Sequence, residues 1–477
     1  MSWLKDNKNK ITFAYIFCFV CYIALNEVEL FSIYAGSVNQ YIYSAFAVLG
    51  GLLLLADFLF ERRMFKAKGT GWLILFVGAI LVSTVVNISF GFAENIKTMA
   101  WTAISMLLLY PFAYTQKRED AVKQIKALSN ALSIFSVITV CISLWMYVTQ
   151  LNLDQLMSNH RYGFVEGRLY GVFTDPNYAA VMMLCIMAMS VFYIANTKSV
   201  LMKVFHSINL FLSYIYVVLS ASRTAQLVFT AAMLLFVGLW IYRTLDKKNM
   251  KRWLAATCAV LIATTSAVAT FASFTPVRYY SGYLPSIMAE KDDPDEPDEP
   301  IKPIDTDRPD VGEDKDISNH RFEIWKDAIN LWKVSPVVGT SPRNHLKFAE
   351  KYFPDSFMVQ RQYSTHNGYL SLLTYTGVLG AGVMLVFILL YFYHLLKKLF
   401  GAKSDYHTLS VAPLLGLIAL VVISAFPMMM IFFLNTIREL IFWLMLGYII
   451  VLTGGEEDTH KPSLLYRLSE KVFAAKK

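Results

Sequence analysis

Residues 72–90 read WLILFVGAILVSTVVNISF, a run of nineteen residues without a charged side chain. Coiled into an α-helix, such a run is about 30 Å long, which matches the hydrocarbon core of a lipid bilayer. A chain inside lipid must pair its backbone polar groups internally, so the run has to be helical. The stretch therefore predicts a membrane-spanning helix.

Similar runs recur along the whole 477-residue chain and predict an all-α, polytopic membrane protein with about twelve spans. Hydrophobic residues make up 56% of the chain and charged residues only 16%, against roughly 25% charged in soluble domains. The predicted spans are 11–25, 41–60, 72–90, 99–114, 131–148, 178–195, 204–219, 225–242, 253–274, 368–396, 408–433 and 440–453.

Lys and Arg in the short connections predict the orientation, because cytoplasmic loops are enriched in these residues. The N-terminus, every even-numbered loop and the C-terminal tail are basic, whereas residues 26–40 after the first span contain no Lys or Arg. This alternation places both termini in the cytoplasm. It also accounts for the net charge of +8 without a nucleic-acid partner.

One connection is much longer than the others and divides the chain into parts. Residues 1–274 form a first membrane domain with nine spans, and residues 367–454 a second with three. Between them, residues 275–366 form an extracytoplasmic loop with an acidic, Pro-rich stretch at about 290–316, predicted to be disordered and dispensable. Residues 317–366 have helical periodicity. The tail, 455–477, is predicted to be an amphipathic helix on the inner membrane face.

Five cysteines lie within apolar runs, where thiols usually pack as small apolar groups. We therefore expect neither a disulfide framework nor a metal site. They are Cys18, Cys21, Cys141, Cys185 and Cys258.

Four arginines, Arg168, Arg223, Arg321 and Arg438, break the charge rule because they fall on the predicted outer side, near the ends of spans. A guanidinium at membrane depth usually has a partner or a ligand. Its planar fork matches two phosphate oxygens at once, so converging arginines would form a site for a diphosphate. The alternative is that each one reaches lipid headgroups or pairs with a nearby carboxylate.

His366 precedes the tenth predicted span, beside Asn367. An imidazole with a pKa near 6.5 can accept a proton from a sugar hydroxyl, which makes His366 the candidate base. The alternative is a structural role in capping the span. His320 is a second candidate because it neighbours Arg321, whereas His160 and His345 are loop residues in less suggestive settings.

Four segments between about residues 160 and 385 resemble motifs of the O-antigen ligase and O-antigen polymerase superfamily. They appear in the family's order, and each is predicted to lie on the outer side. The segments are Arg168-x-x-Gly171 with Pro176-Asn177, Ser220-x-Ser222-Arg223, Arg321-x-x-x-Trp325-x-x-Ala328 with Pro336-x-x-Gly339, and His366-Asn367 with Gly377-x-x-Gly380. The chain departs from the family at Thr340-Ser341, where G-x-G is frequent, and at Thr376, where an acidic residue is frequent.

The resemblance implies a metal-independent, cofactor-free glycosyltransferase of surface polysaccharide assembly. Such enzymes move a glycan from a polyprenyl-diphosphate carrier to a hydroxyl acceptor at the outer face of the bacterial cytoplasmic membrane. By this resemblance Arg223 and Arg321 would bind the diphosphate and His366 would act at the acceptor. Flippase and chain-length-regulator proteins would be partners. The remaining predicted substrate-binding residues are Arg168, Asn177, Asn367 and Arg438.

The leading interpretation is a polymerase that uses an undecaprenyl-diphosphate-linked glycan. The alternative is a ligase that attaches finished polysaccharide to a lipid or cell-wall acceptor, since both activities share these motifs. A twelve-span transporter of lipid-linked sugars is disfavoured, because transporters usually show two similar halves. Here the long loop splits the spans nine to three.

Overall fold

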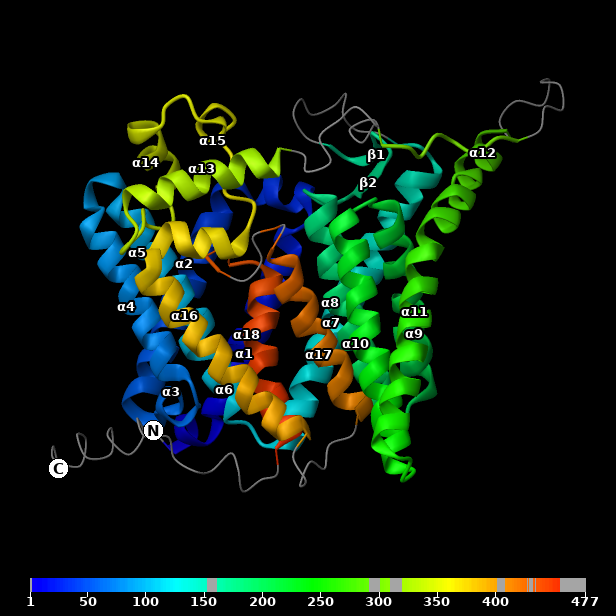
Figure 1. Ribbon diagram of the computed structural model, residues 1–477, viewed down its shortest axis with the longest axis horizontal. Coiled ribbons are helices and arrows are strands. Elements are labelled where there is room, and N and C mark those ends of the chain that lie inside the picture. Colours follow the sequence, from blue (N-terminus) through cyan, green and yellow to red (C-terminus); the bar gives the residue numbers. More distant parts are fainter. Residues whose placement is uncertain are drawn as a thin grey trace.

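The computed structural model describes residues 2–151, 161–290, 301–308, 320–400, 408–426, 428, 432–433 and 435–454. Long helices run side by side between two ends of a bundle (Figure 1). Each of the twelve predicted spans falls on a helix. These helices are α1 (Ser2–Asn26), α2 (Glu29–Ala56), α4 (Thr70–Val86), α5 (Phe92–Ala103) with α6 (Tyr110–Tyr114), α7 (Arg118–Val148), α8 (Pro176–Ala195), α9 (Val200–Leu219), α10 (Arg223–Lys247), α11 (Arg252–Ser281), α16 (Gly368–Phe400), α17 (Thr408–Ser424) and α18 (Ile437–Thr453).

Nine helices in the described part of the chain are long and apolar enough to cross a membrane. Thr70–Val86 and Val411–Ser424 are shorter apolar helices, and α18 has 17 residues. The structure thus confirms a helical protein with multiple membrane spans, while the count of twelve and the orientation stay predictions.

Several helices are longer than their apolar runs. Helix α2 begins at Glu29 rather than near residue 41, α7 begins at Arg118 rather than near 131, and α11 continues to Ser281. Hydropathy detects only the segment that matches hydrocarbon, whereas a helix can continue into the polar region. Helix α17 instead ends early, at Ser424, since the following Pro427 disfavours helical backbone at the residue before it.

A two-stranded hairpin is the exception to the all-α prediction. Strand β1 (Gly163–Val165) pairs antiparallel with β2 (Arg168–Gly171), so the predicted Arg-x-x-Gly segment is a strand. Residues 152–160, including His160, lie outside the described residues.

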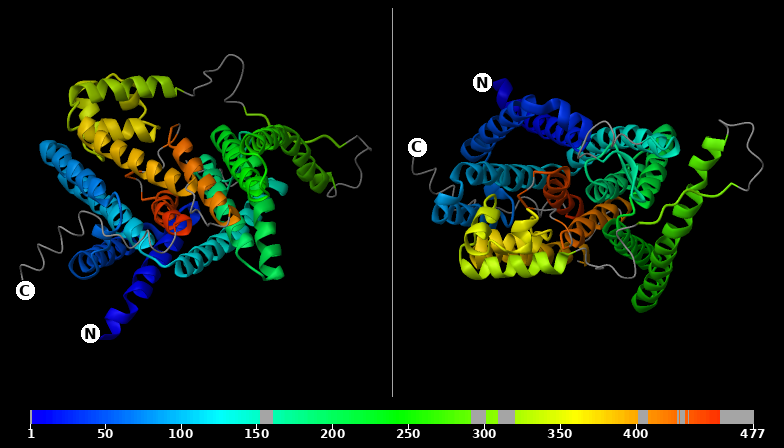
Figure 2. Two further views of the ribbon diagram at one scale, coloured as in Figure 1. Left: turned by 60° about the horizontal axis from the view of Figure 1, so that its bottom comes forward. Right: turned by 90° about the horizontal axis from the view of Figure 1, so that it is seen from above.

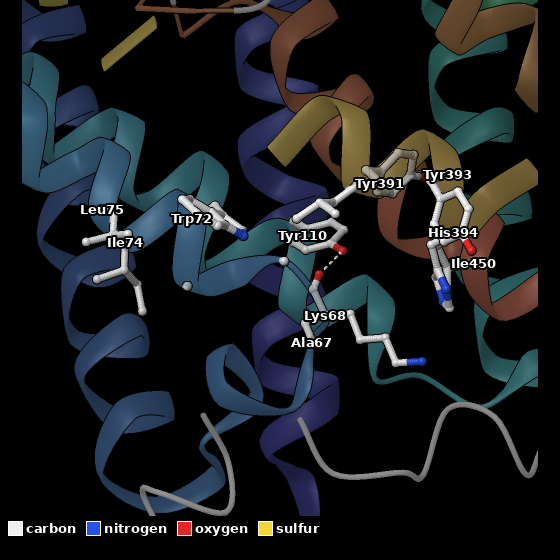
Figure 3. Close-up of a pocket in the computed structure, with 13 residues that line it drawn as sticks. Ala67, Lys68, Trp72, Ile74, Leu75, Tyr110, Tyr391, Tyr393, His394 and Ile450 are labelled. Carbon is white, nitrogen blue, oxygen red and sulfur yellow. Dashed lines mark hydrogen bonds between the residues drawn. The ribbon is translucent and has the colours of Figure 1, made fainter. Parts of the chain in front are cut away.

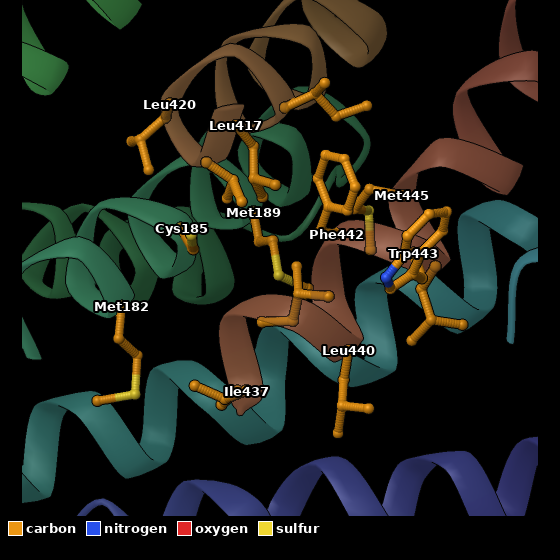
Figure 4. Close-up of a cluster of buried hydrophobic side chains, with 14 of the residues drawn as sticks. Met182, Cys185, Met189, Leu417, Leu420, Ile437, Leu440, Phe442, Trp443 and Met445 are labelled. Atoms are coloured by element: carbon orange, nitrogen blue, oxygen red, sulfur yellow. The ribbon is translucent and has the colours of Figure 1, made fainter. Parts of the chain in front are cut away.

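Helix α18 forms the centre of the bundle. Every residue from Ile437 to Thr453 is buried, as expected for a helix that is apolar on all sides after Arg438 and Glu439 in its first turn. Figure 4 shows Phe442 of this helix near Leu417 of α17 and Met189 of α8, whereas Leu440 points away from them. All five cysteines are free thiols in the structure.

The long loop gathers at one end of the bundle, opposite the start of α1 (Figure 1). It contains α12 (Tyr283–Glu290), α13 (Arg321–Val334), α14 (His345–Tyr352) and α15 (Phe357–Gln360). Seen from above, α13 lies close to α16, and the long helix α11 lies at the edge of the bundle (Figure 2). Residues 291–300 and 309–319 of the acidic stretch, and the tail 455–477, lie outside the described residues.

Helix α16 is kinked at Gly377, and the loop after α13 is bonded to this kink. Gly377 has φ 63° and ψ −170°, a backbone conformation essentially restricted to glycine. Two backbone N–H groups of the loop donate to α16, Thr340 to the Thr374 carbonyl (2.9 Å) and Ser341 to the Tyr375 carbonyl (3.0 Å). A Cβ at Gly339 would collide with the α16 backbone. The motif glycines therefore join the loop to the bundle by close backbone packing.

Candidate active site

Four helices begin at the loop end of the bundle: α8 at Pro176, α10 at Arg223, α13 at Arg321 and α16 at Gly368. A helix N-terminus carries a partial positive charge and unpaired N–H groups, and both favour anions. Residues next to three of these starts satisfy some of those N–H groups as caps.

The caps come from the predicted motifs. The Asp175 carboxylate accepts hydrogen bonds from the backbone N–H groups of Asn177 and Tyr178, at 2.6 and 3.2 Å. The Ser222 hydroxyl accepts one from Ala225 (3.3 Å). These short polar side chains fix where each helix starts, and so fix the first side chains of each helix.

A pocket of about 220 Å³ lies where these segments meet. It brings together the predicted residues Asn177, Arg321 and His366, together with the second candidate His320, from positions up to 189 apart in the sequence. The full lining is Asp175, Asn177, Tyr178, His320, Arg321, Ile324, Tyr363, His366 and Met428.

Arg321 is a positively charged residue that lines this pocket. In the described part of the chain, no hydrogen bond or ion pair holds its guanidinium. Burial lowers the pKa of Arg321, and the neighbouring positive charges of Arg223 and Arg308 lower it further, against the opposing effects of Tyr178 and Asp175. Like charges placed together at a partly buried site favour binding of an anion.

The His366 imidazole lies across the same pocket. His366 has a left-handed backbone (φ 44°), and its ring packs edge-on against Tyr363 with centroids 5.5 Å apart. Burial lowers the pKa of His366, the charge of Arg321 lowers it further, and Asp175 opposes this. Since a lowered pKa keeps the imidazole neutral at neutral pH, the ring can accept a proton.

Arg168 and Asn177 bind each other at the edge of the site. The Arg168 guanidinium donates to the Asn177 Oδ1 at 2.7 Å and to the Ser220 carbonyl at 3.1 Å. These contacts tie strand β2 to the start of α8 and to the turn before Arg223. The structure therefore supports a positioning role for Arg168, and Asn177 also lines the pocket.

Asn367 and Arg438 have structural contacts that the sequence did not reveal. The Asn367 Oδ1 accepts from the backbone N–H groups of Tyr369 and Leu370, at 2.9 and 3.0 Å, and so caps α16. The Arg438 side chain is almost fully buried. It pairs with the Glu27 carboxylate at 3.1 Å and donates to the Tyr178 carbonyl at 3.1 Å. Arg438 thus supports the pocket wall from behind.

The other histidines differ from His366. His320 contacts the Glu323 carboxylate at 2.9 Å and lines the pocket. His345 is buried against the Tyr375 ring, with centroids 4.9 Å apart, and burial lowers the pKa of His345 to about 4. It does not line the pocket.

A larger cavity of about 750 Å³ lies near the opposite end, among α4, α6, α16 and α18 (Figure 3). Its walls are mainly aromatic and aliphatic, with Trp72, Tyr110 and Tyr391 prominent, and its basic side chains are Lys68 and His394. It contains none of the predicted site residues, and its apolar lining does not suit a diphosphate.

Sequence reasoning missed five of the residues that line the pocket, namely Asp175, Tyr178, Ile324, Tyr363 and Met428. Asp175 lies inside the Pro-Asn motif and could have been noticed as a helix cap before Pro176. Arg308, whose charge lowers the pKa of Arg321, lies inside the acidic stretch, and nothing in the sequence connects the two residues.

Residues 208–385 match the family model described as O-antigen ligase. The matched range includes Arg223, Arg321, His366 and Asn367, and it confirms the resemblance drawn from the motifs. No curated protein matches the chain.

Proposed function

We propose that this chain, which residues 208–385 place in the O-antigen ligase and polymerase superfamily, transfers a glycan from undecaprenyl diphosphate to a sugar hydroxyl. The family match supports a membrane enzyme of polysaccharide assembly. The finer proposal rests on the pocket that Arg321 and His366 both line. Arg223 lies close enough for its charge to act on Arg321.

The donor's diphosphate would lie at the two arginines. Its negative charge compensates the repulsion between Arg223 and Arg321, and the starts of α10 and α13 add their partial positive charges. Charge on the diphosphate grows as the glycosidic bond breaks. Guanidinium groups already in position therefore stabilise the transition state more than the bound donor.

The chemical step is a direct displacement. The acceptor hydroxyl oxygen forms a bond to the anomeric carbon of the donor, while the bond between that carbon and the diphosphate oxygen breaks. The diphosphate leaves with the electron pair, and the hydroxyl proton passes to the neutral His366 imidazole. Attack opposite the leaving group inverts the anomeric configuration.

The predicted topology puts this chemistry at the outer face of the membrane. By the charge alternation, α8, α10 and α16 all begin on the outer side, and the structure gathers their starts around the loop end of the bundle. The polyprenyl chain would remain in the bilayer while its diphosphate reaches the arginines.

We propose polymerisation as the activity, with ligation as the alternative. The test uses the purified full chain in nanodiscs with lipid-linked glycan extracted from the host's membranes, and products are separated by size. A ladder of lengthening lipid-linked glycans supports polymerase, whereas transfer only onto added lipid or cell-wall acceptor identifies a ligase. The proposal fails if the folded protein releases no undecaprenyl diphosphate with either acceptor.

A further inference from the structure

Residues 301–308, within the stretch predicted to be disordered, follow a defined path across the site end. The Ile304 N–H donates to the Gly282 carbonyl at 3.0 Å, next to the end of α11. The Arg278 guanidinium donates to the Thr306 carbonyl and, at 2.6 Å, to the Gly167 carbonyl. We name residues 301–308 the strap.

The strap lies directly on the β1–β2 turn. Gly167 has φ 66°, and a Cβ there would collide with the Asp307 carbonyl oxygen. Only glycine allows this approach without displacement of the strap. Close packing of this kind, together with the Arg278 bonds, fixes where the next residue, Arg308, is placed.

Arg308 contacts the turn that precedes Arg223. Its Nη1 donates to the Ala221 carbonyl at 3.0 Å, and Arg168 donates to the adjacent Ser220 carbonyl at 3.1 Å. Two guanidinium groups therefore bind consecutive carbonyls of one turn, two and three residues before Arg223.

Electrostatic proximity supports the same placement. The positive charge of Arg308 acts on Arg321 across the site, in addition to that of Arg223. Among the described residues, the Asp175 carboxylate acts on Arg321 and the Asp307 carboxylate acts on Arg278. The strap thus brings the charge of Arg308 near enough to act on Arg321.

We propose that Arg308 is a further donor-binding residue, which adds its positive charge to the diphosphate site from the strap. This inference rests on the proposed function, because it assigns the anion to the polyprenyl diphosphate. A consequence is that only residues of the acidic stretch outside the strap can be dispensable. It also gives a residue beyond the matched motifs a direct role in donor affinity.

The test measures binding of farnesyl diphosphate to the purified full chain in nanodiscs, with farnesyl monophosphate for comparison. Arg308→Ala and Arg308→Gln should bind the diphosphate roughly tenfold more weakly, since each loses a charge-assisted contact. Arg308→Lys keeps the charge and should stay close to the parent affinity. Lys302→Ala, which removes an exposed charge from the same strap, should bind like the parent.

Each variant separates a charge role from a structural one. Gln keeps an N–H donor for the Ala221 carbonyl, so parent affinity in Arg308→Gln would overturn the proposal and leave Arg308 a support of the turn. Equal weakening by Lys302→Ala would also overturn it, because the effect would then be unspecific.

Failure of the proposed function is recognised separately. If Arg321→Ala weakens binding and Arg308→Ala does not, only this inference is wrong. If the parent protein does not bind farnesyl diphosphate more tightly than the monophosphate, and Arg321→Ala changes nothing, the donor site itself is wrong. Thermal unfolding of every variant shows whether a loss of binding reflects a loss of folding.

Discussion

Replacement of Arg321 separates a ligand-binding arginine from a structural one. In the described part of the chain, no hydrogen bond or ion pair holds its guanidinium, and its neighbours include the like charges of Arg223 and Arg308. Arg321→Ala should therefore leave thermal stability unchanged or slightly higher, because repulsion within the cluster is relieved. Few substitutions of a half-buried arginine would have that effect.

Activity should fall steeply in the same variant. A charge-assisted hydrogen bond contributes about 1.5–3 kcal/mol, and a guanidinium fork makes two of them to a diphosphate. A loss of about 3 kcal/mol from the transition state lowers kcat/KM about a hundredfold. Arg321→Lys should be nearly as harmful, because an ammonium group cannot form the fork.

The control for Arg321 is another arginine of the same end, Arg438, which pairs with Glu27 at 3.1 Å in a buried setting. Removal of one partner from a buried ion pair costs about 3–5 kcal/mol of stability, so Arg438→Ala should unfold at a lower temperature. The assay measures glycan transfer and thermal unfolding on the same purified variants. If Arg321→Ala destabilises the protein as Arg438→Ala does, or transfers glycan at the parent rate, the donor role of Arg321 is refuted.

Four further predictions concern the base, its pKa, metal and orientation. His366→Ala should bind the lipid-linked donor normally while transfer collapses; a stable variant that transfers at the parent rate would exclude a catalytic role. Asp175→Asn keeps the helix cap but removes the negative charge that raises the pKa of His366. The acid limb of the pH–rate profile should therefore move to lower pH, and a shift to higher pH would contradict the effect of Asp175 on His366. Transfer should continue in excess chelator, since the arginines supply the charge stabilisation; full inhibition that added divalent metal reverses would disprove this. A reporter after Lys248 should be cytoplasmic and one near Asp310 extracytoplasmic, and reporters on the same side would overturn the orientation.

The helices and their approximate positions could be predicted because lipid leaves the chain few choices. A run such as residues 72–90 must be helical, and the basic loops alternate with nearly neutral ones. What hydropathy could not indicate was the polar extension of α7 back to Arg118 or the left-handed kink at Gly377. Both depend on contacts outside the hydrocarbon region.

The site was predictable to the extent that its residues lie in motifs, but contacts decide what each one does. Asn367 and Arg321 are both polar residues at the start of a helix on the predicted outer side. From the sequence alone, both residues are predicted to bind the substrate. Asn367 caps its own helix, whereas Arg321 has no contact of this kind in the part of the chain that the structure describes. A short polar side chain can form hydrogen bonds with the backbone of its own helix. A guanidinium that lies beside other guanidinium groups does not form such a bond with its own backbone.

Arg308 is the opposite case, because it lies outside the motifs and yet is placed near the site. Its neighbours in sequence are acidic, so the local sequence alone predicts no more than a residue of a solvated segment. Its placement depends on Gly167 and Arg278, which are 141 and 30 residues away and which hold the strap over the turn before Arg223. A residue that reaches a site through such distant packing carries no signal in its own surroundings. The charge that completes an anion site can therefore come from the segment that looks least functional, and donor affinity of Arg308 variants measures that contribution directly.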